Sequence, residues 1–354
     1  MVEREKSEIF DIADEIGEKS RQRLKSPAIK ALYEAYEETG VLFSLAEILQ
    51  AVPSDYRAPV VHTLGSHITK EKPLFVYSLG KSTDMPERDV RLLAASIDML
   101  WSLALIFDDI VDEDTQRAGE DAAWVVFGKE KAYKSAQAGL SAVFSKLQGR
   151  FGNQVVNRCR FYISSGIGSV AAHRRLTLDS SADSIINNYI QRANFHALFP
   201  VDAICSKTGE EKEREDAVKA LREVNLAGQI LNDFKDLTSQ YCWIRAGFSD
   251  IRGGLVTVPI RYVWEKLNEE EKAKFQRVFG NNNFDESSRK FLEDCFSPDG
   301  RWEPLRVYIR ELYFSSWWHF RQAVPKESLQ SYFGVWVSYK LAQVDQAFEH
   351  QPNE

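Results

Sequence analysis

The segment ALIFDDIVDED, residues 104–114, joins an apolar run to five carboxylates within seven residues. Trp101 and Leu105 are four positions apart, which is helical spacing, and the acidic residues begin three positions after Leu105. Asp108 and Asp112 lie four positions apart, so they share one helix face. Like charges on one face repel each other unless a cation lies between them. A solvated acidic helix end is the alternative, but a solvated face should not continue into an apolar stripe. The segment therefore predicts a core helix that binds cations at its end.

Helical spacing repeats through most of the chain, and alternating, strand-like patterns are scarce. Turn sequences such as Val52-Pro-Ser-Asp55 separate the predicted helices, which include 27–50, 120–150 and 152–175. No repeat or long linker divides the chain. We therefore expect one all-α domain over residues 1–354.

Composition favours a globular protein of the cytoplasm. The chain has 354 residues, of which 44% are hydrophobic and 27% charged, and its net charge of −7 favours no nucleic-acid partner. The four cysteines contain no CxxC pair, which argues against a zinc site or a disulfide framework. The N-terminal residues lack the apolar core of a signal peptide. The apolar run 92–107 is short and contains Asp98, so we expect no stable membrane insertion.

A second oxygen-rich helix face lies in GQILNDFKDL, residues 228–237. Asn232 and Asp236 are again four positions apart, Gln229 lies one turn earlier, and Asp233 is beside them. Carboxylate and amide oxygens suit Mg²⁺, which often keeps waters and substrate phosphates as its other ligands. Two such helices facing each other across an apolar cavity would bind a diphosphate on an apolar tail, and the cations would help the diphosphate to leave.

These segments resemble the motifs of the trans-isoprenyl diphosphate synthases and the related class I terpene synthases. The family's DDxxD motif, followed after four residues by Arg-Arg-Gly, is matched by Asp108, Asp109, Asp112 and Arg117. Its second motif, Gln-x-x-DDxxD, is matched by Gln229, Asn232, Asp233 and Asp236. The resemblance covers residues 55–270, and 271–354 are expected to form aromatic-rich C-terminal helices. It implies a single-domain helical bundle of the isoprenoid synthase type with a central apolar cavity.

The resemblance also implies a role for each matched residue. The implied metal ligands are Asp108, Asp109, Asp112, Asn232, Asp233 and Asp236. The implied catalytic residues are Asp108, Asp112, Arg117 and Asp233. The implied substrate-binding residues are Trp101, Leu103, Ala104, Arg117, Arg192, Gln229, Arg245 and Arg252. For the arginines at 192, 245 and 252, an ordinary surface salt bridge is an equal alternative.

The same resemblance implies the cofactor and the partners. Mg²⁺ is the expected metal, with three ions bound and Mn²⁺ as a possible substitute. The small Ala104, four residues before the first motif, favours a prenyl diphosphate of C15 to C20 or longer. A homodimer is the expected oligomer.

Departures from the family pattern concern the acceptor, isopentenyl diphosphate. The family binds it through a Gly-Lys-x-x-Arg segment, a histidine seven residues before the first motif, and the second arginine of Arg-Arg-Gly. These four charged positions fall on Thr69, Lys72, Trp101 and Ala118, although Lys70 or Lys72 could partly serve. Losing several phosphate contacts should weaken acceptor binding, because charge-assisted hydrogen bonds are strong.

We therefore expect first a terpene synthase (cyclase) that ionises an allylic prenyl diphosphate and releases diphosphate. Two alternatives stay open. One is a trans-prenyltransferase that uses isopentenyl diphosphate or another acceptor. The other is a non-catalytic subunit of a heteromeric prenyl synthase.

Overall fold

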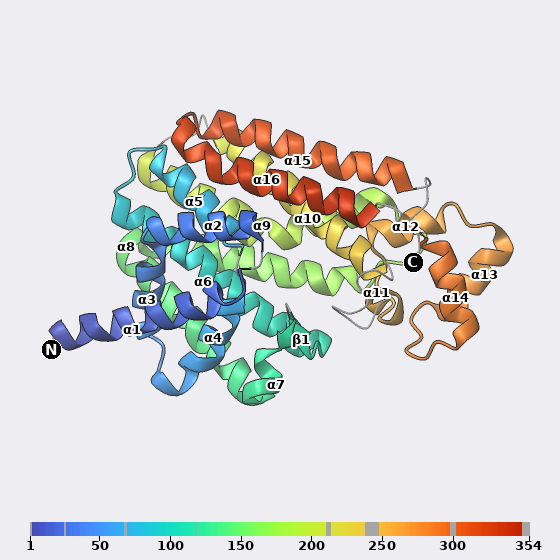
Figure 1. Ribbon diagram of the computed structural model, residues 1–354, viewed down its shortest axis with the longest axis horizontal. Helices are drawn as coiled ribbons and strands as arrows, with labels where there is room; N and C mark the ends of the chain where they lie inside the picture. Colours follow the sequence, from blue (N-terminus) through green and yellow to red (C-terminus); the bar gives the residue numbers. More distant parts are fainter. Residues whose placement is uncertain are drawn as a thin grey trace. The chain divides into compact units, whose positions relative to one another are not determined.

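The computed structural model describes residues 2–24, 26–66, 69–117, 119–209, 214–237, 248–297 and 302–348. Within these ranges the secondary structure is helical apart from one two-stranded hairpin, so the all-α prediction is confirmed (Figure 1). The elements are α1 (Val2–Arg21), α2 (Pro27–Glu38), α3 (Val41–Gln50), α4 (Ser54–Ser66), α5 (Glu71–Lys81), α6 (Glu87–Asp112), β1 (Gln116–Arg117), β2 (Glu120–Asp121), α7 (Ala123–Phe127), α8 (Lys129–His173), α9 (Ala182–Thr208), α10 (Arg214–Leu237), α11 (Ser249–Arg252), α12 (Val258–Trp264), α13 (Glu269–Val278), α14 (Glu286–Cys295), α15 (Glu303–Ala323) and α16 (Glu327–Phe348).

The chain divides into two compact units, each assembled from three separate segments. Unit 1 comprises Met1–Arg160, His196–Val218 and Phe320–Trp336, and unit 2 comprises Phe161–Phe195, Lys219–His319 and Val337–Glu354. The first aspartate motif belongs to unit 1 and the second to unit 2. The expectation of a single domain over 1–354 stays a prediction.

Helix α6 is the central helix of unit 1. It packs against α3, α4, α5 and α7 (Figure 1), and its Leu93, Ile97 and Ile106 are fully buried. By length and composition, α6 is also the one helix in the described ranges that could cross a membrane, but 67% of its most apolar window is buried inside the protein. Such burial is typical of a core helix. The helix ends at Glu113, whose φ of 58° is left-handed, so the aspartates lie in its last turn.

Two glycines with positive φ interrupt the helices, one where the sequence predicted a continuous helix and one where it predicted a break. The predicted helix 27–50 is broken at Gly40, whose φ of 71° is incompatible with a continuing helix. A break at Gly152, with a φ of 82°, separates two helical halves within α8, as the two predictions 120–150 and 152–175 required. The hairpin of β1 and β2 was not predicted.

Unit 2 contains the second motif and most of the C-terminal aromatic residues. Phe234 of α10 is fully buried, and the centroid of its ring lies 3.9 Å from that of the Phe348 ring. The N-terminal half of α15 is tied to α16, because Arg306 and Arg310 both pair with Asp345, at 2.7 and 2.5 Å. The two helices run side by side in Figure 1. Phe234 and Phe348 are therefore packing residues of unit 2, and the expected division of the chain at residue 270 stays a prediction.

Candidate active site

The first aspartate motif lies at the end of α6, and Arg117 folds back onto it. Arg117 Nε donates to Asp109 Oδ1 at 2.6 Å, and its Nη2 lies 3.3 Å from Asp108 Oδ2. The left-handed turn at Glu113 allows β1 to return toward the helix end. The Asp109 side chain is 2% exposed, that of Asp108 is 43% exposed, and Asp112 is exposed. Asp108 and Asp112 are therefore the carboxylates of this motif that a ligand can reach.

The position of this motif concentrates negative charge. The peptide dipoles of a helix place roughly half a negative charge at its C-terminus, and the last turn of α6 contains no basic residue. Burial raises the pKa of Asp109, and the hydrogen bond from Arg117 opposes that rise. Arg117 therefore neutralises only part of the cluster, and the remaining potential favours a cation at Asp108 and Asp112.

Trp101, two helical turns before Asp108, is covered by Lys72. Lys72 Nζ lies 3.7 Å from the centroid of the Trp101 ring and 3.0 Å from Glu71 Oε1. The side chains of Lys72 and Glu71 are only 12% and 14% exposed. A cation held over an aromatic ring and beside a carboxylate has much of its charge compensated. Lys72 is thus already engaged by two neighbouring side chains.

Lys70 is fully buried in an ion pair with Asp98. Its Nζ lies 3.0 and 3.2 Å from the two carboxylate oxygens and donates to Leu64 O at 3.1 Å. The Tyr36 hydroxyl also donates to Asp98, at 2.8 Å, and both charged side chains are 0% exposed. A ligand cannot reach Lys70 in this conformation. The expectation that Lys70 could partly serve the acceptor is therefore not met.

The two residues expected to set chain length lie in different environments. Leu103 is 2% exposed and packs on α8, where a methyl group at Gly139 would come within 2.7 Å of Leu103 Cδ2. Ala104 is only half-buried. Ala104 is therefore the more accessible of the two, and the expected chain length stays a prediction.

The second motif lies near the end of α10, where Asp233 is held from two sides. Tyr189 of α9 donates its hydroxyl proton to Asp233 Oδ2, and Gln229 donates to Oδ1 at 2.7 Å. Asp233 is 6% exposed, and burial raises its pKa to about 7 although both hydrogen bonds favour the charged form. Asn232 is exposed and Asp236 is half-buried. The structure brings Gln229 and Asp233 together and leaves Asn232 as the most accessible oxygen ligand of this motif.

Asp236 joins the end of α10 to the start of α11. Its Oδ1 accepts from Ser249 Oγ at 2.9 Å, and its Oδ2 accepts from the Asp250 backbone N–H at 3.2 Å. Its backbone oxygen accepts from Phe248 N–H at 2.9 Å. Each carboxylate oxygen has further lone-pair capacity. Asp236 can therefore hold this turn and still coordinate a cation.

The three candidate arginines after the first motif differ in their surroundings. Arg192 is close enough to Asp233 for its positive charge to lower the pKa of that carboxyl, against the larger effect of burial. The guanidinium of Arg252 lies 5.1 Å from the centroid of the Phe284 ring. Arg245 lies outside the described residues. Of the two described arginines, Arg192 is the one that acts on a motif residue.

The donor atoms of both motifs fit Mg²⁺. All of them are hard oxygens, but no group of three or more acidic, histidine or cysteine side chains in the described ranges could hold a metal. Mg²⁺ is commonly bound by one or two carboxylates together with waters and substrate phosphates. Asp108 and Asp112 would form one such set, and Asn232 and Asp236 another. The number of ions, the use of Mn²⁺, and a facing arrangement of the motifs across a cavity stay predictions.

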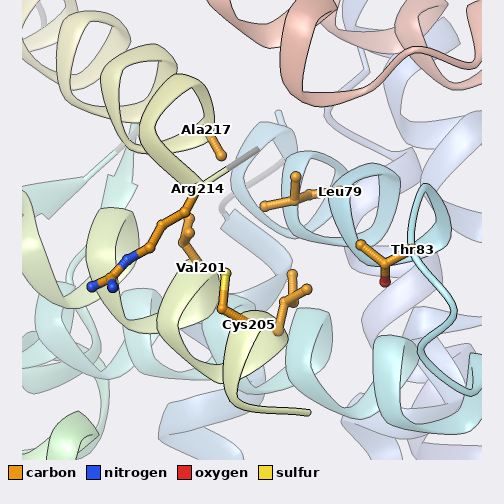
Figure 2. Close-up of a pocket in the computed structure, with 7 residues that line it drawn as sticks. Leu79, Thr83, Val201, Cys205, Arg214 and Ala217 are labelled. Carbon is orange, nitrogen blue, oxygen red and sulfur yellow. The ribbon is translucent and has the colours of Figure 1, made fainter. Parts of the chain in front are cut away.

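A small pocket in unit 1 lies apart from every predicted site residue. Its lining comes from α5, the turn that follows it, α9 and α10, and comprises Leu79, Thr83, Val201, Ile204, Cys205, Arg214 and Ala217 (Figure 2). The one charged lining residue is Arg214, whose guanidinium donates to the buried Asp202 at 2.6 Å. This pocket therefore offers little to a diphosphate.

Sequence reasoning missed Tyr189 and Asp98. Each makes its contact across a long sequence separation: Tyr189 reaches Asp233, and Asp98 pairs with Lys70. Helical spacing reports which residues share a face of one helix and not which residue of another helix meets them. The spacing of Asp98 within an apolar stripe was a signal that it needed a buried partner.

Comparisons with known proteins show which family the chain resembles. Residues 56–295 match the family model described as polyprenyl synthetase. A short chain isoprenyl diphosphate synthase of Methanocaldococcus jannaschii is 23% identical over 282 residues, which are 73% of this chain and 85% of that protein.

Two solved structures share the fold. A decaprenyl diphosphate synthase from Rhodobacter capsulatus superposes with a TM-score of 0.76 at 16% identity, over 91% of this chain and all of its own. A geranylgeranyl pyrophosphate synthase from Corynebacterium glutamicum, in complex with isoprenyl diphosphate and magnesium, gives 0.67 at 16% identity over 90% and 99% of the two chains.

Proposed function

Because the chain belongs to the polyprenyl synthetase family, whose members are enzymes acting on prenyl diphosphates, we propose that it ionises an allylic prenyl diphosphate and transfers the prenyl group to an acceptor. The family prediction and the isoprenoid synthase fold are thereby confirmed. The relatives reported above are named as diphosphate or pyrophosphate synthases, so they favour the prenyltransferase alternative over the terpene synthase that we expected first. Cyclisation has no specific support among them.

The accessible pair of carboxylates on α6 carries this proposal. Asp108 and Asp112 share a face, remain open to a ligand, and lie at the negative end of a helix dipole. Asp98, deeper in the same helix, is by contrast fully buried and paired with Lys70. Carboxylates that stay exposed at this position are suited to a site loaded together with an anionic substrate.

Each residue has a part in the proposed reaction. Asp108 and Asp112 would hold Mg²⁺, which supplies positive charge to neutralise the departing diphosphate. Arg117 keeps the motif compact by pairing with both Asp109 and Asp108. Trp101 and Ala104, on the preceding turns of α6, would keep water from the allylic cation. The allylic carbon–oxygen bond would break first and release the diphosphate. The double bond of the acceptor would then add to the allylic cation, and the cation so formed would lose a proton to the departed diphosphate to give the product.

The terpene synthase stays a second candidate because of two observations in unit 1. Lys72 is engaged by Trp101 and Glu71, and Lys70 is buried with Asp98. Both lysines are therefore poorly placed to grip the diphosphate of a second substrate. No observation favours a non-catalytic subunit.

We further propose the remaining expected properties as a set. They are a substrate of C15 to C20 or longer, a cytoplasmic location, a homodimer, and no binding to nucleic acid or insertion into membranes. Light scattering on the purified chain tests the dimer, since a single monomeric mass would exclude it.

A product assay tests the proposed function. The purified protein is incubated with Mg²⁺ and C10, C15, C20 or C25 prenyl diphosphate, with and without isopentenyl diphosphate. A longer diphosphate formed with the acceptor is the expected result. A hydrocarbon or alcohol formed without the acceptor would replace this proposal with the terpene synthase.

The matched variants are Asp108→Asn and Glu113→Gln. Asp108→Asn should lower kcat by about 100-fold or more, because it removes charge stabilisation at the reacting group. Glu113 is the next acidic residue after the motif, its side chain is 78% exposed, and its replacement should leave kcat unchanged. Equal activity in the two variants would refute the assignment of Asp108.

A further inference from the structure

We propose that Tyr189 is a positioning residue for the second aspartate motif: its hydroxyl fixes Asp233 and so sets how α10 presents Asn232 and Asp236 to cations. This inference rests on the proposed metal-dependent function. Tyr189 contacts Asp233 and would not itself touch the substrate.

The Tyr189 hydroxyl joins three elements of unit 2. The residue is 3% exposed on α9, and its hydroxyl donates to Asp233 of α10. The same oxygen accepts from the backbone N–H of Val258, the first residue of α12, at 3.2 Å. One oxygen therefore uses both its donor and an acceptor site, and it cannot rotate without breaking two hydrogen bonds.

Asp233 is clamped on both of its oxygens. Tyr189 supplies the hydrogen bond to Oδ2 and Gln229 the one to Oδ1. Asn232 and Asp236 lie on the neighbouring face of the same helix, so fixing the Asp233 carboxylate also fixes the rotation of α10 that presents them. Mg²⁺ requires nearly ideal octahedral geometry at short distances, so a small rotation of its ligands lowers affinity.

A further layer of buried groups holds the Tyr189 ring. The His173 ring stacks on it with the centroids 5.8 Å apart and the planes 11° from parallel. His173 Nδ1 lies 3.0 Å from Asn188 Oδ1, and the Asn188 amide donates to Ser169 O at 2.6 Å. His173 and Asn188 are 4% and 7% exposed. Interactions behind a metal ligand commonly decide its orientation.

The chain supplies a matched control for a purely structural role. Tyr36 is also fully buried, and its hydroxyl also donates to a buried carboxylate, Asp98 Oδ2, at 2.8 Å. Asp98 is neutralised by Lys70 and belongs to neither motif. Tyr36→Phe and Tyr189→Phe each remove one hydroxyl from one buried carboxylate and keep the ring.

The test compares the Mg²⁺ requirement of the two variants. In Tyr189→Phe, the Mg²⁺ concentration for half-maximal diphosphate release should rise about 10-fold, as for other residues behind a metal ligand. The Mg²⁺ concentration that gives half of the thermal stabilisation by Mg²⁺ with inorganic diphosphate should rise with it. Tyr36→Phe should lower the melting temperature and leave both midpoints at the wild-type value. Gln229→Met, which removes the other donor to Asp233, should shift the midpoints in the same direction as Tyr189→Phe.

Three outcomes separate this inference from the proposed function. Wild-type midpoints in Tyr189→Phe, or equal shifts in both tyrosine variants, would overturn the inference, while a longer diphosphate formed by the wild type upholds the function. Should Tyr189→Phe fail to fold, a wild-type midpoint in Gln229→Met would overturn it equally. Absence of diphosphate release from the wild type would instead refute the proposed function, and the thermal midpoints would still decide the role of Tyr189.

Discussion

The buried pair of Lys70 and Asp98 gives a prediction that separates a structural lysine from a substrate-binding one. In Lys70→Met, the aliphatic stem is kept and the ammonium is lost. Asp98 then keeps the hydrogen bond from Tyr36 but loses its cation, and its charge is still buried. Lys70 is the residue before the first turn of α5, and its backbone there is left-handed, with a φ of 48°.

The magnitude follows from burial. Removing one partner of a buried ion pair typically costs about 3–5 kcal/mol, because an uncompensated charge stays in a medium of low dielectric. Both side chains here are 0% exposed, and three contacts of 3.0 to 3.2 Å are lost with the ammonium. We therefore expect Lys70→Met to lower the free energy of unfolding by this amount. Lys70→Met/Asp98→Asn should recover most of it, since the amide is neutral and still accepts from Tyr36.

Urea unfolding followed by far-UV circular dichroism measures the loss. Lys81→Met is the control, because its partner Glu87 is 3.1 Å away but the two side chains are 33% and 42% exposed. Such an exposed pair should contribute about 1 kcal/mol or less. The reasoning would be refuted if Lys70→Met were as stable as Lys81→Met. A raised KM for isopentenyl diphosphate at unchanged stability would show instead that Lys70 binds substrate.

Three further predictions concern other parts of the chain. Burial raises the pKa of the Cys159 thiol to about 12, so Cys159 should resist alkylation at pH 8 until the protein unfolds. The half-buried Cys205 should react in the folded protein. Modification of Cys159 in the folded protein, detected by mass spectrometry, would contradict this prediction. Burial, and then the charge of Arg192, lowers the pKa of His173 below its ordinary value, so the unfolded chain binds this proton more readily and the unfolding free energy should fall as pH drops through about 6.5. His173→Gln should flatten that slope, and an unchanged slope would exclude His173 as its source. Asn268 caps α13 in a capping box, so Asn268→Ala should lower the unfolding free energy by about 1 kcal/mol; no loss in urea unfolding would count against the cap.

Much of the fold could be predicted because it depends on local periodicity. The apolar stripe of α6 and the break at Gly152 are both properties of short stretches of sequence. The break at Gly40 was missed because a helix tolerates a glycine, and only the surrounding packing decides whether that glycine becomes left-handed. The hairpin of β1 and β2 was missed because two-residue strands have no detectable period.

The sequence predicted which residue types form the candidate site, but it did not predict which contacts those residues make. The spacing of Asp108 and Asp112 was sufficient to suggest a cation site. It could not indicate that Asp109 is buried against Arg117, or that Asp233 is clamped by Tyr189. The first contact depends on the chain turning back after α6, and the second joins two separate helices across 44 residues. No single-helix pattern encodes either contact.

Helix α6 contains acidic residues in two different environments. Asp98, in the middle of the helix, is neutralised by a lysine and accepts a hydrogen bond from a tyrosine, both from elsewhere in unit 1. Asp108 and Asp112, in the last turn, lie at the negative end of the helix dipole, and the arginine beside Asp108 also pairs with Asp109. The dipole disfavours carboxylates at this position, and both side chains are open to solvent. A cation bound there would offset the dipole, which agrees with the proposed binding of Mg²⁺ at this helix end.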